Sequence, residues 1–320
     1  MSSIKSKIIQ IGKTHSQIVF LALIIIVLST VVTFVNPRFM SALNISNLFR
    51  QISVTGICAI AMALVLISGG FDLSIGSLVS LISCVIASLV NSGMPEAGAL
   101  LCGMLCGLVC GGINGIIIAK SRCAPVIITL GTMGVFKGAA LLIAGGNIIN
   151  FNEPIPILST TVIFGRPTIV IILAFVVIVT YLFLKLTIMG RRIYALGSNQ
   201  EASFLSGVNI VLTKMIVYAI AGLIVSFASI ALLMRLGSAS AVMGDTYTLS
   251  AVASAVIGGI AISGGRGSIG GCFLGILLLG LISNSMNIMG VTAYLQDIVL
   301  GMIVVIAAVV SVLGTRGSKA

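Results

Sequence analysis

The sequence predicts an all-α integral membrane protein with about ten transmembrane helices. Hydrophobic residue types make up 59% of the 320 residues, and charged types make up only 7%. A soluble domain carries about 25% charged residues, so this chain cannot cover a surface that faces water on all sides. Its 17 Lys and Arg stand mostly in short gaps between long apolar runs. We therefore expect lipid to surround most of the chain.

The first apolar run, residues 18–35, is long enough to cross a bilayer as one helix. Lys5, Lys7 and Lys13 precede it and no small-residue cleavage site ends it, so we expect a retained helix with a cytoplasmic start. Nine further spans are predicted at residues 50–68, 74–90, 98–119, 125–144, 168–186, 211–234, 249–262, 270–288 and 293–313. The span at 249–262 is short and rich in Ala, Ser and Gly, and an alternative with eight spans and two re-entrant segments stays open.

Ten spans with a cytoplasmic N-terminus divide the cations unevenly between the two sides. The cytoplasmic side receives Lys5, Lys7, Lys13, Lys120, Arg122, Lys185, Arg191, Arg192, Lys214, Arg266, Arg316 and Lys319. The outer side receives Arg38, Arg50, Arg166 and Arg235. This asymmetry follows the positive-inside rule and predicts that both termini are cytoplasmic. The scatter of the cations also argues against nucleic-acid binding, which gathers them on one face.

Cysteine and histidine do not form a pattern typical of catalysis or metal binding. Cys102, Cys106 and Cys110 recur every four residues, each followed by Gly, and therefore share one helix face. Small residues at this spacing let membrane helices approach closely, so we interpret this face as a packing surface. The single histidine, His15, has no partner cluster, and no metal site or Cys–His nucleophile pair is predicted.

Two similar glycine-rich turns form an internal pseudo-repeat. SGGFDLSIG spans 68–76 and SGGRGSIG spans 263–270, after the second and the eighth predicted span. An offset of six spans predicts repeats in parallel orientation. Unpaired backbone groups cannot face lipid but can line a cavity that holds a polar solute. We therefore predict that these turns line or gate a translocation path, with plain turn structure as the alternative.

The residues predicted to line the path or its gate are glycines and small polar residues in these turns and in the spans. They are Ser68, Gly69, Gly70, Asp72, Ser74, Asn114, Thr129, Ser263, Gly264, Gly265, Asn284 and Asn287. Asn284 and Asn287 are three residues apart and share one helix face. The polar side chains of Asp72, Ser74, Asn114, Thr129, Asn284 and Asn287 could each join neighbouring helices instead.

Lys137 lies within a predicted span, about twelve residues (roughly 18 Å of helix) past Pro125. A bare ammonium at this depth is costly, so it should pair or extend toward water. Asp297, early in the last span, has a compatible depth, and we predict a Lys137–Asp297 ion pair. None of the six acidic residues sits plainly at mid-span, which argues against proton-coupled or sodium-coupled transport, although a sodium site built from backbone stays open.

The hydrophilic stretch 187–210, which contains GRRIYALGSNQEASFLSGV, is predicted to lie on the cytoplasmic side. A loop that only connects two spans needs less length. A short docking helix from about Gln200 to Leu205, ended by Gly207, fits the preference for glycine after a helix.

Five motifs carry a family resemblance over nearly the whole chain. They are ISGGFDLSIGSLVSL, PVIITLGTMGVFKGAAL, GRRIYALGSNQEASFLSGV, SAVIGGIAISGGRGSIGG and LISNSMNIMGV, in this order. With them the chain resembles the ribose/monosaccharide-type permeases of bacterial ABC importers. The resemblance implies the ABC importer permease fold in the bacterial cytoplasmic (inner) membrane. It also implies one transmembrane permease domain over 1–320, with 187–210 as its cytoplasmic coupling loop.

In such importers an EAA-x-x-x-G loop docks in a cleft of the ATPase. Glu201-Ala202-Ser203-x-x-x-Gly207 keeps this spacing, with Ser at the third position. The resemblance implies that the ATPase-coupling loop includes Gly190, Arg191, Arg192, Asn199, Glu201, Ala202, Ser203 and Gly207.

The resemblance further implies three protein partners besides membrane lipid. They are a cytoplasmic ABC ATPase subunit that uses ATP and Mg, a periplasmic or lipoprotein sugar-binding protein, and a second permease copy or paralogue. No G-x-x-x-x-G-K-[ST] phosphate loop is present, so we expect a transport subunit without a cofactor or ATPase site of its own rather than an enzyme. A stand-alone secondary transporter or channel for a small polar solute is the alternative, and a non-transporting scaffold is a third. The motifs indicate a monosaccharide without naming which one.

Overall fold

The computed structural model describes residues 2–121, 123–152, 162–163 and 166–316. Arg122 and Lys319, two of the cations predicted on the cytoplasmic side, lie outside these residues. Within them the fold is all-α apart from four strands of two residues. β1 (Ile149–Asn150) pairs with β4 (Ser238–Ala239), and β2 (Val162–Ile163) pairs with β3 (Arg166–Pro167), both antiparallel.

Each predicted span contains one apolar helix. These helices are α1 (Ser2–Val35), α2 (Ala42–Ile67), α3 (Ile75–Asn91), α4 (Glu96–Lys120), α5 (Pro125–Ala144), α7 (Thr168–Leu186), α10 (Ile210–Leu236), α11 (Tyr247–Ile257), α12 (Ile269–Ile288) and α13 (Ala293–Arg316). By length and composition, 7 helices in the described part of the chain can cross a membrane, namely α1, α2, α4, α5, α7, α10 and α12. In α3, α11 and α13 the apolar stretch is shorter.

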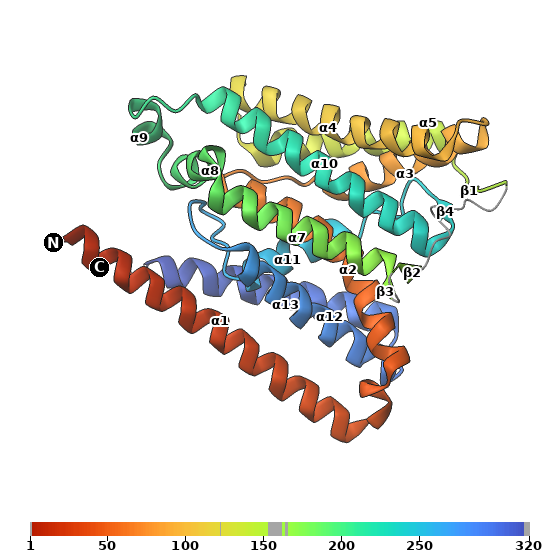
Figure 1. The fold of residues 1–320 in the computed structure, drawn as a ribbon, viewed down its shortest axis with the longest axis horizontal. Helices are drawn as coiled ribbons and strands as arrows, with labels where there is room; N and C mark the ends of the chain where they lie inside the picture. The colour runs from red at the N-terminus through yellow and green to blue at the C-terminus, as the bar shows by residue number, and fades with distance from the viewer. Residues whose placement is uncertain (1, 122, 153–161, 164–165, 317–320) are drawn as a thin grey trace.

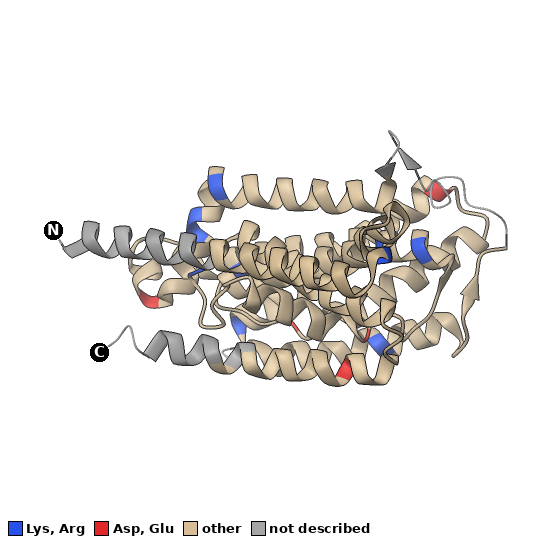
Figure 2. Cartoon of the chain, turned by 90° about the horizontal axis from the view of Figure 1, so that it is seen from below, with Lys and Arg blue, Asp and Glu red and all other residues tan. Residues whose placement is uncertain are grey.

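The helices run between two distinct ends of the molecule. The start of α1, the end of α13, and the short helices α8 (Ile188–Ser198) and α9 (Gln200–Leu205) lie at one end, and the four strands lie at the other (Figure 1). A short 3-10 helix, η1 (Pro37–Met40), joins α1 to α2. Charged residues gather toward both ends and leave the middle of the helices largely uncharged (Figure 2). We call the end with α8 and α9 the inner end and the opposite one the outer end.

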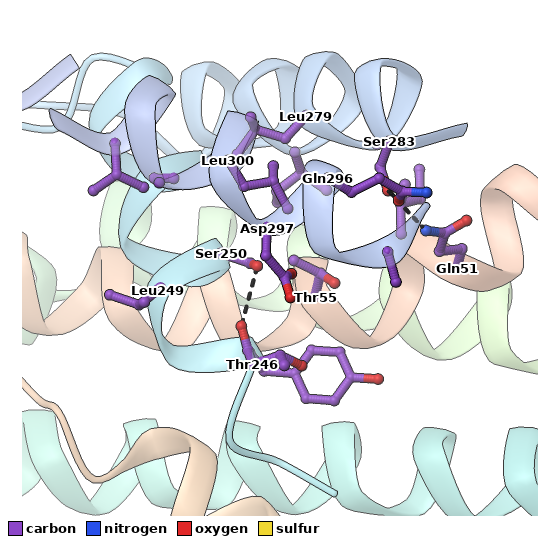
Figure 3. A pocket seen from close by; sticks show the side chains of 18 of the residues that line it. Gln51, Thr55, Thr246, Leu249, Ser250, Leu279, Ser283, Gln296, Asp297 and Leu300 are labelled. Atoms are coloured by element: carbon purple, nitrogen blue, oxygen red, sulfur yellow. Dashed lines mark hydrogen bonds between the residues drawn. The ribbon is translucent and has the colours of Figure 1, made fainter. Parts of the chain in front are cut away.

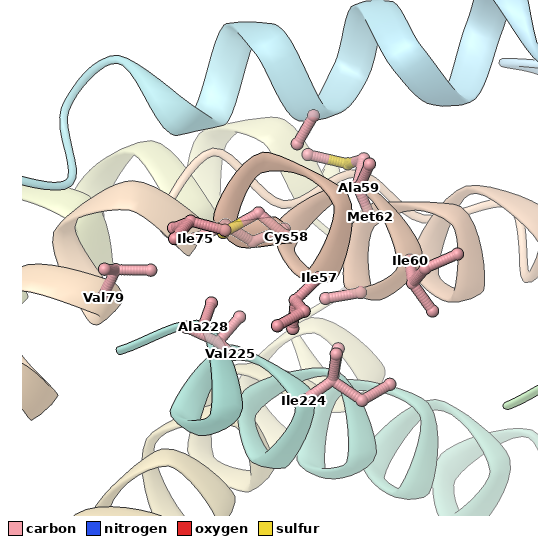
Figure 4. Packing of buried hydrophobic residues seen from close by; sticks show 14 of the residues in the cluster. Ile57, Cys58, Ala59, Ile60, Met62, Ile75, Val79, Ile224, Val225 and Ala228 are labelled. Carbon is pink, nitrogen blue, oxygen red and sulfur yellow. The ribbon is translucent and has the colours of Figure 1, made fainter. Parts of the chain in front are cut away.

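Helix α2 forms the centre of the bundle. Its inner half, residues 56–67, is completely buried, and it packs against α7, α10, α11 and α12. Figure 4 shows Ile57 and Cys58 of α2 packed between Val79 of α3 and the Ile224–Ala228 stretch of α10. Protein rather than lipid therefore surrounds this apolar helix.

The Cys-Gly face of α4 is a packing face, as predicted. Gly107 and Gly111 are buried against Gly222 of α10, and a Cβ on Gly111 would lie 3.1 Å from the Cα of Gly222. The backbones of the two helices thus touch where a side chain would separate them.

The packing pairs reveal an inverted repeat. α3 packs on α4 and α5 as α11 packs on α12 and α13, and α4 packs on α10 as α12 packs on α2. The spans α2 to α5 therefore correspond to α10 to α13, an offset of five spans. Because each span reverses the direction of the chain, an odd offset inverts the second half. The predicted parallel repeat is wrong, since the two similar turns follow α2 and α11, which do not correspond.

The corresponding helices α3 and α11 begin deep in the molecule, after non-helical stretches that come from opposite ends. The backbone N–H of Gly76 donates to Thr248 Oγ1 and that of Gly244 donates to Ser80 Oγ, each at 2.9 Å. The starts of the two helices are thus fastened to each other, which places polar backbone inside the bundle, where protein shields it from lipid.

Candidate functional site

Helices α8 and α9 project from the inner end of the bundle. The hydroxyl of Thr187 caps α8 by accepting from Gly190 N (3.0 Å), and the amide oxygen of Asn199 caps α9 by accepting from Ala202 N (2.9 Å). Gly207 follows α9 with a φ of +79°, which glycine adopts without strain. The predicted short helix from Gln200 to Leu205 is confirmed, and its role in docking stays a prediction.

The outward face of α9 is partly apolar. Glu201 is exposed, and the side chains of Phe204 and Leu205 are 67% and 84% exposed. Ser203 instead turns inward and its hydroxyl donates to the Asn199 carbonyl (2.8 Å). Exposed large apolar side chains on a short helix outside the bundle indicate a protein contact, and the sequence prediction missed Phe204 and Leu205.

The two glycine turns meet beneath α8. The backbone N–H of Gly265 donates to the Ile67 carbonyl (2.8 Å), and the phenol of Tyr194 in α8 donates to the Gly267 carbonyl (3.0 Å). Burial raises the pKa of Tyr194 above its ordinary value, so the phenol keeps the proton that it donates. A Cβ on Gly197 of α8 would overlap the Ile67 carbonyl oxygen. Helix α8 therefore packs directly against both turns.

Four predicted path residues hold the first turn, and they are not among the lining residues of the two cavities described below. Asp72 accepts from the backbone N–H (2.8 Å) and the hydroxyl (2.6 Å) of Ser74. The amide of Asn114 donates to the Ser74 hydroxyl (3.0 Å), and the backbone N–H of Leu73 donates to Thr129 Oγ1 (3.1 Å). The side chains of Asp72, Ser74, Asn114 and Thr129 are all buried.

Four further turn residues lie at an inner cavity of about 230 Å³. Ser68, Gly69, Gly70 and Ser263 line it together with residues 196–200 of α8 and α9. These four turn residues and Asn199 of the predicted coupling loop thus share one cavity wall. Gly264 and Gly265 lie outside that wall and pack against Gly69 and Ser198 respectively.

Asn284 and Asn287 join helices at the outer end. Asn44 of α2 and Asn284 exchange amide hydrogen bonds (3.0 Å), and Gln296 of α13 donates to Asn287 (2.8 Å). Neither asparagine lines the inner cavity or the outer cavity described below. The two side chains lie on α12 and join that helix to α2 and α13 through these hydrogen bonds.

Lys137 pairs with Asp245 rather than with Asp297. Its ammonium lies 2.6 Å from Asp245 Oδ2, and both side chains are about 40% exposed (39% and 41%). Asp245 lies between the predicted spans 211–234 and 249–262, and the fold brings this stretch before α11 back into the bundle beside α5. The predicted Lys137–Asp297 pair is therefore corrected to Lys137–Asp245.

A larger cavity of about 510 Å³ lies toward the outer end, between α2, α11, α12 and α13 (Figure 3). Its polar lining consists of Gln51, Thr55, Arg235, Asp245, Thr246, Tyr247, Ser250, Ser283, Gln296 and Asp297. Asp297 points from α13 into this cavity (Figure 3). Sequence reasoning missed this site because its residues come from separate elements and form no local motif.

Comparison with known proteins gives consistent relatives. Residues 44–308 match the family described as branched-chain amino acid transport system / permease component. The ribose import permease protein RbsC of Bacillus subtilis (strain 168) is 40% identical over 299 residues, 90% of each chain. RbsC of Escherichia coli (strain K12) is 36% identical, covering 89% of this chain and 91% of its own. The fructose import permease protein FrcC of Rhizobium meliloti is 30% identical, covering 92% and 86%.

No solved structure matches the chain. The family match covers most of its length, and the relatives align with nearly all of it. Together with the apolar helical bundle and the projecting α8 and α9, these matches establish that the chain is a membrane permease and belongs to the branched-chain amino acid transport system / permease component family.

Proposed function

We propose that this chain is the membrane-spanning subunit of an ABC importer that carries a monosaccharide, ribose-like or related, into the cell. The relatives are named as import permeases for ribose, fructose, D-allose and L-arabinose, and these cargoes are all monosaccharides. The energy comes from ATP and Mg on a separate cytoplasmic ATPase. A periplasmic or lipoprotein sugar-binding protein delivers the sugar at the outer end, and a second permease copy or paralogue completes the path.

One observation carries this proposal: helix α8, which leads directly into the exposed helix α9, packs against both glycine turns. A partner that binds Phe204 and Leu205 can displace α8 through the short connection at Asn199. Gly197 of α8 packs against Ile67 and Gly265, which are hydrogen-bonded to each other. A displacement of α8 therefore acts on both turns. In this proposal the coupling loop 187–210 transmits the movement of the ATPase to the region that separates the two cavities.

In this proposal the inner end faces the cytoplasm, so both termini are cytoplasmic. The positive-inside distribution of Lys and Arg supports this orientation. The structural link between α9 and the turns supports it as well, since an ATPase acts from the cytoplasm.

Reconstitution in liposomes tests the function. The chain with its ATPase and binding protein should take up a monosaccharide only when ATP is supplied, and omission of the ATPase should abolish uptake. Uptake by the chain alone would instead indicate a secondary transporter or channel. Glu201→Lys and Gly207→Val should leave ATP hydrolysis measurable while uptake falls, because the charge and the φ of +79° belong to the docking segment. Normal uptake in both variants would refute the docking assignment.

A further inference from the structure

We propose that the outer cavity binds the monosaccharide during its passage and that Asp297 is its principal recognition group. This inference rests on the proposed function. It assigns the sugar to the side chains of Asp297 and Arg235, which line the same cavity.

The cavity combines an ordered polar wall with two exposed charged side chains. Gln51 donates to the Ser283 hydroxyl (3.2 Å), and that hydroxyl lies 3.5 Å from the Gln296 amide oxygen, so α2, α12 and α13 form one connected surface. Among the described residues, the side chains of Asp297 and Arg235 make no hydrogen bond or ion pair. Charged groups within a membrane protein are costly unless they face partners or a water-filled cavity. These two side chains are therefore available to a ligand.

Asp245, the second carboxylate at the cavity, is already engaged. Its Oδ2 holds the ammonium of Lys137, which neutralises it. Asp297 and Arg235 then remain, with opposite charges and without an ion pair among the described residues. This arrangement favours a neutral solute over an anion or a cation, since either ion would leave one of the two groups beside a like charge.

A monosaccharide matches the chemistry of the walls. A carboxylate accepts from two neighbouring hydroxyls, a guanidinium donates to sugar oxygens, and the amides and hydroxyls of the wall can do both. Ile276, Leu279 and Leu300 supply apolar surface for the C–H faces of the ring. The volume of about 510 Å³ falls in the usual range for small-molecule sites. A lipid chain would fill the apolar part but leave Asp297 and Arg235 unpaired.

The cavity lies on the outer side of the joined glycine turns. The outer and inner cavities share no lining residue. Between them lies the completely buried inner half of α2 together with the joined glycine turns. A sugar in the outer cavity is thus separated from the inner end by the glycine turns, against which α8 packs.

Protection from thiol labelling tests the inference in the complete complex of permease, ATPase and binding protein. Ser250→Cys places a thiol on the cavity wall, and Asn147→Cys places one on the surface at the same end. D-ribose, L-arabinose, D-allose and D-fructose are added one at a time with a membrane-impermeant maleimide. We expect at least one sugar to slow labelling of Cys at 250 several-fold without slowing it at 147.

Asp297→Asn in the Ser250→Cys background should raise the sugar concentration needed for protection about tenfold, the effect of losing a charge-assisted hydrogen bond. Glu96→Gln removes a carboxylate at the same end but outside the cavity, and it should leave protection unchanged. Protection by none of the sugars, or protection that Asp297→Asn leaves intact, would overturn the inference. Labelling that is slow in lipid and fast in detergent regardless of sugar would assign the cavity to lipid and also overturn it.

ATP-dependent uptake by the wild-type complex, measured in the same preparation, separates the two proposals. Uptake without protection refutes the cavity site alone. Absence of uptake for all four sugars counts against the proposed function itself.

Discussion

The ammonium of Lys137 lies 2.6 Å from a carboxylate oxygen of Asp245, although 108 residues separate them in the chain. The pair connects α5, the last helix of the first repeat, to the non-helical stretch that leads into α11 of the second. It therefore holds the two halves of the inverted repeat together at one edge of the outer cavity, where Asp245 forms part of the wall.

Breaking this ion pair from one side should destabilise the protein. Lys137→Met leaves the Asp245 carboxylate unpaired and Asp245→Asn leaves the ammonium unpaired, at a cost of about 2–3 kcal/mol for an unpaired charge in a membrane span. The half-exposed position of both groups lowers this figure, since water screens them. Thermal unfolding in detergent, monitored by size-exclusion chromatography, should show a lower unfolding temperature in both single variants.

Two double variants serve as controls for this pair. Lys137→Asp with Asp245→Lys restores opposite charges, and Lys137→Met with Asp245→Asn removes both. Each should recover most of the lost thermal stability. A charge-swapped protein no more stable than the single variants would show that the pair contributes little.

Gly197→Ala should damage transport, because its Cβ would overlap the Ile67 carbonyl oxygen and lie 2.5 Å from Gly265 N. Backbone atoms cannot move aside cheaply, so α8 must shift away from the turns. We expect uptake in proteoliposomes to fall at least tenfold. Gly270→Ala is the matched control, since a Cβ there meets nothing within 4 Å. Equal activity of the two variants would contradict the close contact.

Removing the apolar side chains of α9 should weaken ATPase binding without harming the fold. Phe204→Ala with Leu205→Ala deletes two exposed side chains that contribute little to the core. Interface residues of this kind cost about 1–3 kcal/mol each when truncated, so the affinity for the ATPase should fall at least tenfold. Affinity is measured by pull-down titration in detergent. Phe34 lies near the C-terminal end of α1, at the outer end, and its side chain is 85% exposed. Phe34→Ala should leave the affinity for the ATPase unchanged, and an equal loss of affinity in this variant would indicate a nonspecific effect.

Thiol labelling should establish the orientation of the chain. Cys123, just before α5 at the inner end, is the one cysteine that is exposed among those described, and Asn147, just after α5, marks the outer end. In intact cells an impermeant maleimide should spare native Cys123 and label Asn147→Cys. Inside-out vesicles should give the reverse pattern. Labelling of Cys123 from outside would invert the assignment and place α9 out of reach of a cytoplasmic ATPase.

Local sequence patterns predicted the helices well. Hydropathy located all ten apolar helices, since a helix in lipid must be apolar along its length. The bounds of α9 also followed from local rules, because Asn199 and Gly207 satisfy the helix ends within a few residues of sequence. The small-residue face of α4 likewise predicted close helix packing.

Relationships between distant segments were harder to predict. The two similar glycine turns suggested a parallel repeat, but they follow α2 and α11, and the helices that correspond in packing are five spans apart. Asp297 seemed a suitable partner for Lys137 by depth alone. Depth does not specify which helices are neighbours, and Asp245 reaches Lys137 only because its segment turns back into the bundle.

The sequence by itself determined that this chain is a bundle of apolar helices with a polar segment at 187–210, because lipid and water sort residues by type along each short stretch. Only the tertiary structure decided that Gly265 bonds Ile67, that Lys137 meets Asp245, and that Asp297 faces a cavity. Such contacts depend on how helices pack against one another, and packing joins residues that no local pattern connects.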